Sequence, residues 1–300
     1  MTFDVVGFGA LNLDKLFKVN IIAKEEQEGF VTNVTESPGG SAANTTVGTA
    51  RLELKTGYVG KVAKDREGQV LLNEFKKEGV DTNGITVSKT GRSGTVMGFV
   101  DPNGDRALYV DPGVNDRISV KDVKMDYVSD TKVLHLTSFV GEKTFRTQKE
   151  VLTQLLDVKI SFDPGALYIS KGINGLKSII EQSTIMFPNS LELMQLTGKD
   201  YKEGAKVLLD MGVEIVAVKL GKQGCYVTDG NEHHTIEAYK VKAIDTTGAG
   251  DAFCAGFLYG LIKENDLYEC GRIGNFVASR CVQKMGARTG LPHLADLKDL

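Results

Sequence analysis

The chain has 300 residues, of which 41% are hydrophobic and 25% are charged, and its formal net charge is −3 at pH 7. This length is sufficient for one large domain with a small appendage or for two domains. The composition is that of a globular protein, and the slightly negative charge gives no support to a nucleic-acid partner.

No apolar run approaches the length that a membrane span needs, and residues 1–7 resemble a first core strand rather than a signal peptide. The four cysteines are not at CxxC spacing, which disfavours a disulfide framework or a zinc knuckle. The adjacent pair His233-His234 predicts a surface loop or strand edge rather than a metal site, because zinc ligands are usually spaced. We therefore expect a cytoplasmic protein without membrane contact.

Strand-like and helix-like runs alternate along the chain. The predicted strands are residues 3–8, 132–136, 158–162, 184–187, 214–218 and 225–228. The predicted helices are residues 42–54, 66–78, 143–156, 172–181, 201–211, 251–263 and 267–284. This alternation predicts an α/β fold with a largely parallel sheet that helices cover on both faces. The ligands of such a sheet collect at the C-terminal ends of its strands.

Two segments, residues 14–36 and 91–111, interrupt the alternation. In the second, the turn signal Asp101-Pro102-Asn103-Gly104 separates two short extended runs and predicts a β-hairpin. We expect the two segments to pair into a small β lid over a site. The alternative is that they are edge strands of the main sheet. With a lid, the α/β domain is residues 1–13, 37–90 and 112–300.

Residues 245–251 read Asp-Thr-Thr-Gly-Ala-Gly-Asp and open into a long apolar helix. Small residues at 248–250 leave backbone N–H groups uncovered at the helix start, where unpaired amides and the helix dipole favour an anion. Asp251 is then placed where a carboxylate reaches whatever lies beside that anion. The pattern favours phosphoryl transfer to a hydroxyl, whereas glycines needed only for a tight turn would not explain the neighbouring hydroxyls and carboxylate.

A second glycine-rich helix start lies at residues 38–44, Pro-Gly-Gly-Ser-Ala-Ala-Asn. Backbone at Gly39 and Gly40 can approach a polar ligand closely, with Asn44 supplying hydrogen bonds. The alternative is a helix cap with Asn44 as a capping or solvated amide. Asp14, in the loop after the first strand, could accept two sugar hydroxyls or simply be solvated.

Two further motifs follow predicted strands. Residues 189–192 read Asn-Ser-Leu-Glu and suit either a capping box or a polar pair that holds hydrated Mg²⁺. Residues 219–224 read Lys-Leu-Gly-Lys-Gln-Gly and form either a plain turn or a phosphate-binding loop. The dinucleotide fingerprint fails, because Asn12 stands where Gly7-Phe8-Gly9 would need a third glycine, and no Walker A loop occurs. An NAD-dependent oxidoreductase is therefore disfavoured.

Together, the motifs at 39–44, 189–192 and 245–251 resemble the two signatures and the NxxE motif of the ribokinase (PfkB) family of carbohydrate and nucleoside kinases. The resemblance extends from Val5 to Pro292. It implies a three-layer α/β/α domain with a β lid. It implies that Asp251 is the catalytic base and that Gly248, Ala249 and Gly250 form an anion hole.

The resemblance also implies roles for other residues. The sugar would be held by Asp14, Gly39, Gly40 and Asn44, and Asn115 partly resembles a residue that some members place near the sugar. The nucleotide would be bound by Asn189, Lys219, Gly221, Gly224, Thr246 and Asn275. Asn189 and Glu192 would act on Mg²⁺ through water, and Asp245 and Thr247, with backbone of residues 286–288, resemble the monovalent-cation (K⁺) site of some members. Lys219 departs from the Thr that many relatives carry.

The expected function is that of an ATP-dependent kinase that phosphorylates a hydroxyl of a ribose-like pentose or other small sugar. ATP is favoured as the donor, because the ADP-dependent branch is usually longer. One alternative is a nucleoside kinase, whose base slot would be built from Met97, Phe99, Tyr109 and Phe139. A sugar-phosphate kinase would need a second anion site at Arg92 and Arg106. The remaining alternative is a non-catalytic sensor of the same fold. An exposed lid edge would favour a homodimer.

Overall fold

The computed structural model describes residues 1–300, apart from the side chain of Asp299. The strands of the large sheet are β1 (Phe3–Phe8), β4 (Thr56–Ala63), β5 (Ile85–Ser88), β8 (Thr131–Thr137), β9 (Lys159–Asp163), β10 (Ile185–Met186), β11 (Ile215–Lys219), β12 (Cys225–Thr228) and β13 (His233–Ile236). Their order is β13-β12-β11-β10-β9-β8-β1-β4-β5. Neighbours from β11 to β5 pair in parallel, whereas β12 and β13 pair antiparallel.

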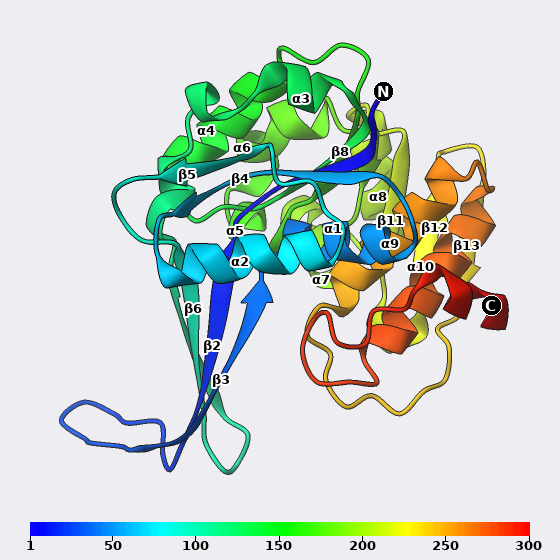
Figure 1. Ribbon diagram of the computed structural model, residues 1–300. Coiled ribbons are helices and arrows are strands. Elements are labelled where there is room, and N and C mark those ends of the chain that lie inside the picture. Colours follow the sequence, from blue (N-terminus) through cyan, green and yellow to red (C-terminus); the bar gives the residue numbers. More distant parts are fainter.

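Helices cover both faces of this sheet (Figure 1). They are α1 (Ser41–Arg51), α2 (Arg66–Lys77), α3 (Met125–Ser129), α4 (Glu142–Leu152), α5 (Gly165–Ile169), α6 (Gly172–Ile180), α7 (Ser190–Thr197), α8 (Tyr201–Asp210), α9 (Ala249–Ile262) and α10 (Leu267–Cys281). Successive strand residues point to opposite faces, so Val6 and Phe8 pack with the α4–α8 side while Val5 packs with α9. None of the described helices is both long and apolar enough to cross a membrane.

A separate four-stranded sheet has the order β3-β2-β6-β7. Its strands are β2 (Asn12–Val19), β3 (Val31–Gly39), β6 (Gly94–Val100) and β7 (Arg106–Asp111). It projects from the layered domain (Figure 1), and β6 and β7 form the predicted hairpin. The predicted fold class is therefore confirmed, and the alternative of edge strands on the main sheet is wrong.

The prediction missed β4, which lies between β1 and the edge strand β5. Its sequence, Thr-Gly-Tyr-Val-Gly-Lys-Val-Ala, carries two glycines that interrupt the β-branched pattern. A Cβ on Gly57 would lie 2.2 Å from the Tyr127 hydroxyl, and the Tyr58 ring packs 4.9 Å from that of Phe75. Aromatic rings therefore occupy the space beside this strand, which explains why glycine is needed there. That reason is visible only in the tertiary structure.

The sheet topology places a ligand site next to β1. The chain continues from β1 to β4 and β5 on one side, whereas the later strands β8 to β11 lie on the other. Open parallel sheets bind ligands at such a reversal, beyond the carboxyl ends of the strands. Loops that follow β1, β8, β9 and β11 therefore converge at one edge of the sheet.

Candidate active site

Helices α1 and α9 bring the two glycine-rich motifs together. A Cβ on Gly48 would lie 2.6 Å from the Ala255 Cβ, so the helices cross at a distance that glycine permits. At the N-terminal ends, the Asn44 Nδ2 donates to the Asp251 Oδ2 at 2.8 Å, across 207 residues of sequence. The Thr45 hydroxyl donates to the Asp251 carbonyl at 3.2 Å. These contacts place the Asn44 amide, which is predicted to bind the sugar, directly against the predicted base.

The start of α9 presents unpaired amides. Gly248 is the N-cap with φ +77°, and a Cβ there would lie 2.5 Å from that of Ala287, so this position requires glycine. The Ala249 N–H donates to the Thr246 carbonyl at 3.2 Å. The N–H groups of Gly248, Gly250 and Asp251 have no acceptor among the described residues. Three amides are therefore available to an anion, and the amide of Ala249 is occupied.

Two cavities meet at this helix start. One has a volume of about 410 Å³ and the other of about 740 Å³. Both are lined by Thr246, Ala249 and Gly250. Asp251 lines only the smaller one, which we call the acceptor cavity. The larger one is called the nucleotide cavity below. A group that bridges the two cavities would pass over the unpaired amides and beside the Asp251 carboxylate.

The acceptor cavity combines Asp14 with walls from the small sheet and the strand loops. Its described lining includes Asn12, Asp14, Gly40, Asn44, Val96, Val110, Ser138, Val140 and Leu167. Gly39 is not among its lining residues, but a Cβ on Gly39 would lie 2.2 Å from the Asp14 Oδ2. The Asp14 Oδ1 is buried without a hydrogen-bond partner among the described residues. Because such an oxygen is costly to leave unpaired, it suits a ligand hydroxyl.

Strand register explains which lid residues face this cavity. Asp14 is paired with Val96, and Val96 with Val110, so these three share one face of the small sheet. Met97 and Tyr109 are the next pair along and therefore lie on the other face. The predicted aromatic slot for a nucleobase does not form, because none of its four members lines this cavity. Phe99 stacks on Phe17 and meets Tyr109, whereas Phe139 meets Phe8.

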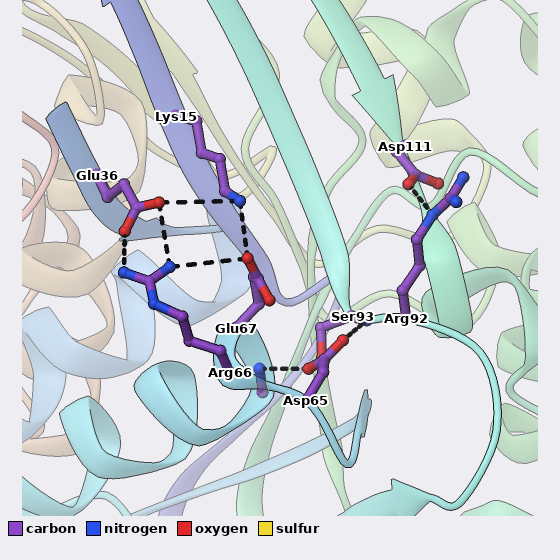
Figure 2. Close-up of polar contacts among 9 residues, drawn as sticks. Lys15, Glu36, Asp65, Arg66, Glu67, Arg92, Ser93 and Asp111 are labelled. Carbon is purple, nitrogen blue, oxygen red and sulfur yellow. Dashed lines mark hydrogen bonds and ion pairs between the residues drawn. The ribbon is translucent and has the colours of Figure 1, made fainter. Parts of the chain in front are cut away.

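Asn115 and the predicted arginines lie outside the acceptor cavity. The buried Asn115 amide donates to the Leu11 carbonyl at 2.9 Å and to the Asn12 Oδ1 at 3.0 Å, so it holds Asn12 in the wall. The Arg92 side chain pairs with Asp111 (Figure 2). Asn12 was not predicted as a site residue, although its place in the short segment between Phe8 at the end of β1 and Asp14 was a usable signal.

The small sheet is tied to the start of α2 by charged side chains, as Figure 2 shows. The Lys15 Nζ lies 2.7 Å from a Glu67 oxygen, and the Arg66 guanidinium lies 2.5 Å from Glu36. Asp65, the N-cap of α2, accepts hydrogen bonds from the N–H and hydroxyl of Ser93, each at 2.7 Å. Strands β2 and β3 and the residue before β6 are therefore all joined to one helix terminus.

The nucleotide cavity has cationic and apolar sides. Its described lining includes the predicted Lys219, Gly221, Gly224, Thr246 and Asn275, and also Lys222, Tyr239, Val241, Phe253, Ala278 and Val282. The Asn275 Nδ2 donates to the carbonyls of Ile236 and Glu237 at 3.0 and 3.2 Å. The Lys219 Nζ lies 2.6 Å from the Asp163 Oδ2, and both side chains are nearly buried. Asp163, at the end of β9, was not predicted.

Asn189 and Glu192 form the predicted capping box at the start of α7. The Asn189 Oδ1 accepts the Glu192 N–H, and the Glu192 Oε2 accepts the Asn189 N–H, each at 2.8 Å. Burial raises the pKa of Glu192, against the opposing charge of Lys219. Asn189 forms a parallel bridge with Lys219, which places the capping box beside the nucleotide cavity. One Glu192 oxygen, Oε1, remains outside the capping box.

The Asp245 carboxylate joins the 245–247 turn to residue 286. It accepts hydrogen bonds from the Thr247 N–H at 3.0 Å, the Thr247 hydroxyl at 2.7 Å and the Gly286 N–H at 2.8 Å. Burial acts to raise the pKa of Asp245, but the Gly286 and Thr247 hydrogen bonds outweigh it and hold the pKa below its ordinary value. The predicted K⁺-site residues are thus adjacent, with a charged carboxylate at their centre.

Both acceptor-cavity carboxylates are less acidic than usual. Burial raises the pKa of Asp251 to about 7, opposed by the Asn44 hydrogen bond and the charges of Lys219 and Arg288. Burial likewise raises the pKa of Asp14 to about 6, opposed by Arg288. A carboxylate with a pKa near 7 is suited to accept a proton at neutral pH.

These shifts predict a pH-dependent stability. Because the folded pKa of Asp251 lies above its unfolded value, the proton-linked stabilisation is complete below about pH 4 and is lost as the pH rises through 7. We therefore expect Asp251→Asn to have a higher Tm than the wild type at pH 8 and a much smaller difference at pH 5. Calorimetry at both values measures this. A Tm difference that is independent of pH would show that the carboxylate is not destabilised by burial.

The chain is similar in sequence and in fold to known sugar kinases. The pfkB family of carbohydrate kinases matches residues 3–294. An uncharacterized sugar kinase of Archaeoglobus fulgidus is 46% identical over 253 residues, which cover 83% of this chain and 100% of that protein. A ribokinase of Staphylococcus aureus is 31% identical over 319 residues, with 100% of both chains covered. The crystal structure of a Thermotoga maritima ribokinase has a TM-score of 0.89 at 25% identity and covers 99% of this chain and 98% of that one. The chain therefore belongs to the pfkB family of carbohydrate kinases and is an ATP-dependent sugar kinase.

Proposed function

We propose that the enzyme transfers the terminal phosphate of ATP to a hydroxyl of an uncharged sugar, with Asp251 as the general base. The observation that carries this proposal is the meeting of the two cavities over the unpaired amides of Gly248, Gly250 and Asp251. Phosphoryl transfer depends mainly on positioning and charge stabilisation, and these amides supply both to the migrating group.

The proposed reaction forms one phosphorus–oxygen bond, breaks another and moves one proton to Asp251. The sugar hydroxyl oxygen forms a bond to the terminal phosphorus while the bond between that phosphorus and the bridging oxygen breaks and ADP leaves. The hydroxyl proton moves to the Asp251 carboxylate, whose pKa of about 7 suits this role. The amides at the start of α9 stabilise charge on the equatorial oxygens, and a single donor of this kind is worth about 3 kcal/mol.

The charges of the acceptor cavity favour a neutral substrate. Among the described lining residues, only Asp14 and Asp251 are charged, and both are acidic. A second phosphate on the acceptor would therefore meet carboxylates without a cation, which argues against a sugar-phosphate substrate. Val96, Val110, Val140 and Leu167 offer an aliphatic wall that suits a sugar's C–H face. Because the same aliphatic wall could also contact a nucleoside, a nucleoside is the second candidate substrate.

The remaining site residues suit the nucleotide and its metal. Lys219 and the 221–224 turn would contact phosphates, and Asn275 would lie near the adenine or ribose. Asn189 and Glu192 would hold hydrated Mg²⁺ beside Lys219, since Mg²⁺ keeps most of its waters and needs few direct ligands. When bound, Mg²⁺ neutralises charge on the phosphates. Asp245, Thr247 and nearby carbonyls would hold K⁺, which would steady the turn before the anion hole.

ADP release tests this function. The purified protein is incubated with ATP and Mg²⁺ and a panel of pentoses, hexoses, nucleosides and sugar phosphates. We expect acceptor-dependent ADP release with a neutral sugar. Turnover with nucleosides alone would select the second candidate, and preference for sugar phosphates would contradict the reading of the acceptor cavity. Binding of sugar and ATP without turnover would indicate a sensor.

We propose that residues 14–36 and 91–111 act as a lid, which the charged contacts to α2 keep in position. Lys15→Met removes the Lys15–Glu67 pair, which is partly exposed. Pairs of this kind contribute about 0.2–1 kcal/mol, so we expect the KM for the sugar to rise by up to about fivefold with little change in the KM for ATP. Steady-state kinetics measures both constants. Lys77→Met, which removes the Lys77–Glu74 pair at the far end of α2, is the matched control. An equal change in both variants would reject the positional role of Lys15.

We also propose a homodimer through the lid. Apolar side chains are exposed on the lid strands, namely Val31 (49%), Val34 (47%), Leu108 (64%) and Tyr109 (60%). Exposed apolar side chains on the strands of an open sheet favour pairing with a second chain. Light scattering after size exclusion should give twice the chain mass, and Leu108→Asp should lower it. A wild-type monomer at micromolar concentration would reject this assembly.

A further inference from the structure

Arg288 is a buried arginine whose charge has no direct partner. It is only 9% exposed, and no described carboxylate lies within ion-pair distance of its guanidinium. Its guanidinium carbon lies 5.7 Å from the centre of the Phe75 ring. Burying a charge in this way is costly unless specific contacts compensate, so the contacts of Arg288 need a functional explanation.

These contacts lead to the catalytic base. The Arg288 Nε donates to the Asn44 Oδ1 at 2.8 Å, and the opposite end of the same amide, Nδ2, donates to the Asp251 Oδ2 at 2.8 Å. A guanidinium can only donate hydrogen bonds. Arg288 therefore requires the Asn44 oxygen on its own side, and this orientation turns the Asn44 NH₂ group toward Asp251.

The opposite orientation of Asn44 would place an oxygen against the Asp251 carboxylate. Two acceptors would then face each other, and the Arg288 donor would meet the NH₂ group. Both contacts would be repulsive in a site where burial strengthens electrostatics. Without Arg288, no donor on the side of the Asn44 amide away from Asp251 would favour the oxygen there. The orientation of the Asn44 amide is thus favoured from both sides, by the Asp251 carboxylate and by the Arg288 guanidinium.

Arg288 is itself held from several directions. Its Nη2 lies 3.4 Å from the Gly39 carbonyl, in the strand end that packs on Asp14. The Arg51 Nη1 donates to the Arg288 carbonyl at 2.7 Å. Its charge opposes the raised pKa values of both Asp14 and Asp251. One side chain therefore contacts the glycine turn and the sugar-site amide and influences both carboxylates.

We propose that Arg288 is a positioning residue, which sets the orientation of the Asn44 amide and thereby aligns Asp251 toward the acceptor hydroxyl. This inference rests on the proposed role of Asp251 as the base. Arg288 does not line either cavity among the described residues, so it acts through Asn44 rather than on the substrate.

The test measures both catalysis and the pKa of Asp251. We expect Arg288→Met to lower kcat on the order of 10- to 100-fold and to move the acidic limb of the pH–rate profile to higher pH, with the KM for ATP little changed. Arg288→Lys, which keeps a donor and a charge, should restore part of both. Arg272→Met, which removes an arginine paired with Glu269 on α10, is the matched control and should change neither.

The substitutions at Arg288 and Arg272 do not alter the other polar and titratable groups near Asp251. They are Asn44, Tyr58, Asp163, Lys219, Cys254 and Cys281. In a double-mutant cycle, Arg288→Met should add little in the Asn44→Ala background, because residues that act through one another are not additive. Full additivity, or an unchanged pH limb with lowered kcat, would overturn the proposal and leave Arg288 a structural residue.

A second readout separates this inference from the proposed function. Carbon NMR titration, assigned with Asp251→Asn, reports the pKa of Asp251 without turnover. It should be higher in Arg288→Met than in the wild type and unchanged in Arg272→Met. If the wild type phosphorylates no acceptor yet this shift occurs, the proposed function fails while the link from Arg288 to Asp251 stands. An unchanged pKa in Arg288→Met contradicts the link itself.

Discussion

Asp251→Asn should lower kcat by about 10²–10⁴ while the affinity for ATP stays nearly intact. Asparagine has almost the same shape as aspartate and can still accept the Asn44 Nδ2 hydrogen bond, which is 2.8 Å long in the wild type. It cannot take up the proton of the sugar hydroxyl. Asp251 also lines the acceptor cavity and not the nucleotide cavity. The loss should therefore fall on the chemical step.

Single-turnover phosphate transfer and ATP titration measure the two effects separately. Asp266→Asn is the matched control, because Asp266 is the N-cap of α10 and accepts a hydrogen bond from the Glu269 N–H at 2.8 Å. That variant should retain wild-type turnover. Turnover near the wild-type rate in Asp251→Asn would mean that another group, or water, accepts the proton.

Asp14→Ala should raise the KM for the sugar by about 10- to 100-fold, with little change in the KM for ATP. The Asp14 Oδ1 is buried and lacks a protein partner among the described residues, so sugar hydroxyls are its natural donors. Hydrogen bonds to a charged group contribute about 1.5–3 kcal/mol, which corresponds to this range. Asp14 stands on the cavity-facing side of β2, opposite Val96.

Initial-rate kinetics with each substrate varied in turn gives both constants. Asp14→Asn should be intermediate, since its amide oxygen still accepts a hydrogen bond while its NH₂ group competes. The pKa of Asp14, raised by burial to about 6, adds a further expectation, because binding should weaken below that pH in the wild type and not in Asp14→Ala. Equal increases of both KM values would remove Asp14 from the sugar site.

Local patterns were sufficient to predict the candidate reacting groups. The glycines before Asp251, the pair Gly39-Gly40 and the Asn189–Glu192 cap are each contiguous, and backbone geometry and helix termini act over a few residues. The strand runs of the parallel sheet were also legible, because they are buried on both faces and nearly continuously apolar. The capping box confirms one such local reading.

Contacts between residues that are distant in the chain could not be predicted from local sequence patterns. Asp163 meets Lys219 across 56 residues, and Arg288 meets Asn44 across 244. The aromatic slot failed because strand parity, not side-chain type, decides which residues face a cavity. Met97 and Tyr109 have side chains that could pack against a nucleobase. The strand register instead turns Val96 and Val110 toward the cavity.

The sequence by itself determined the family, and it located the helix start and the carboxylate that we propose as the phosphate-binding amides and the base. Each of these depends on short runs of residues whose chemistry does not require a distant neighbour. Only the tertiary structure decided how that base is held, which lid residues reach the acceptor and which amides remain unpaired. The physical reason is that side-chain orientation and hydrogen-bond satisfaction depend on what packing brings within about 3 Å, and that distance is not encoded in sequence separation.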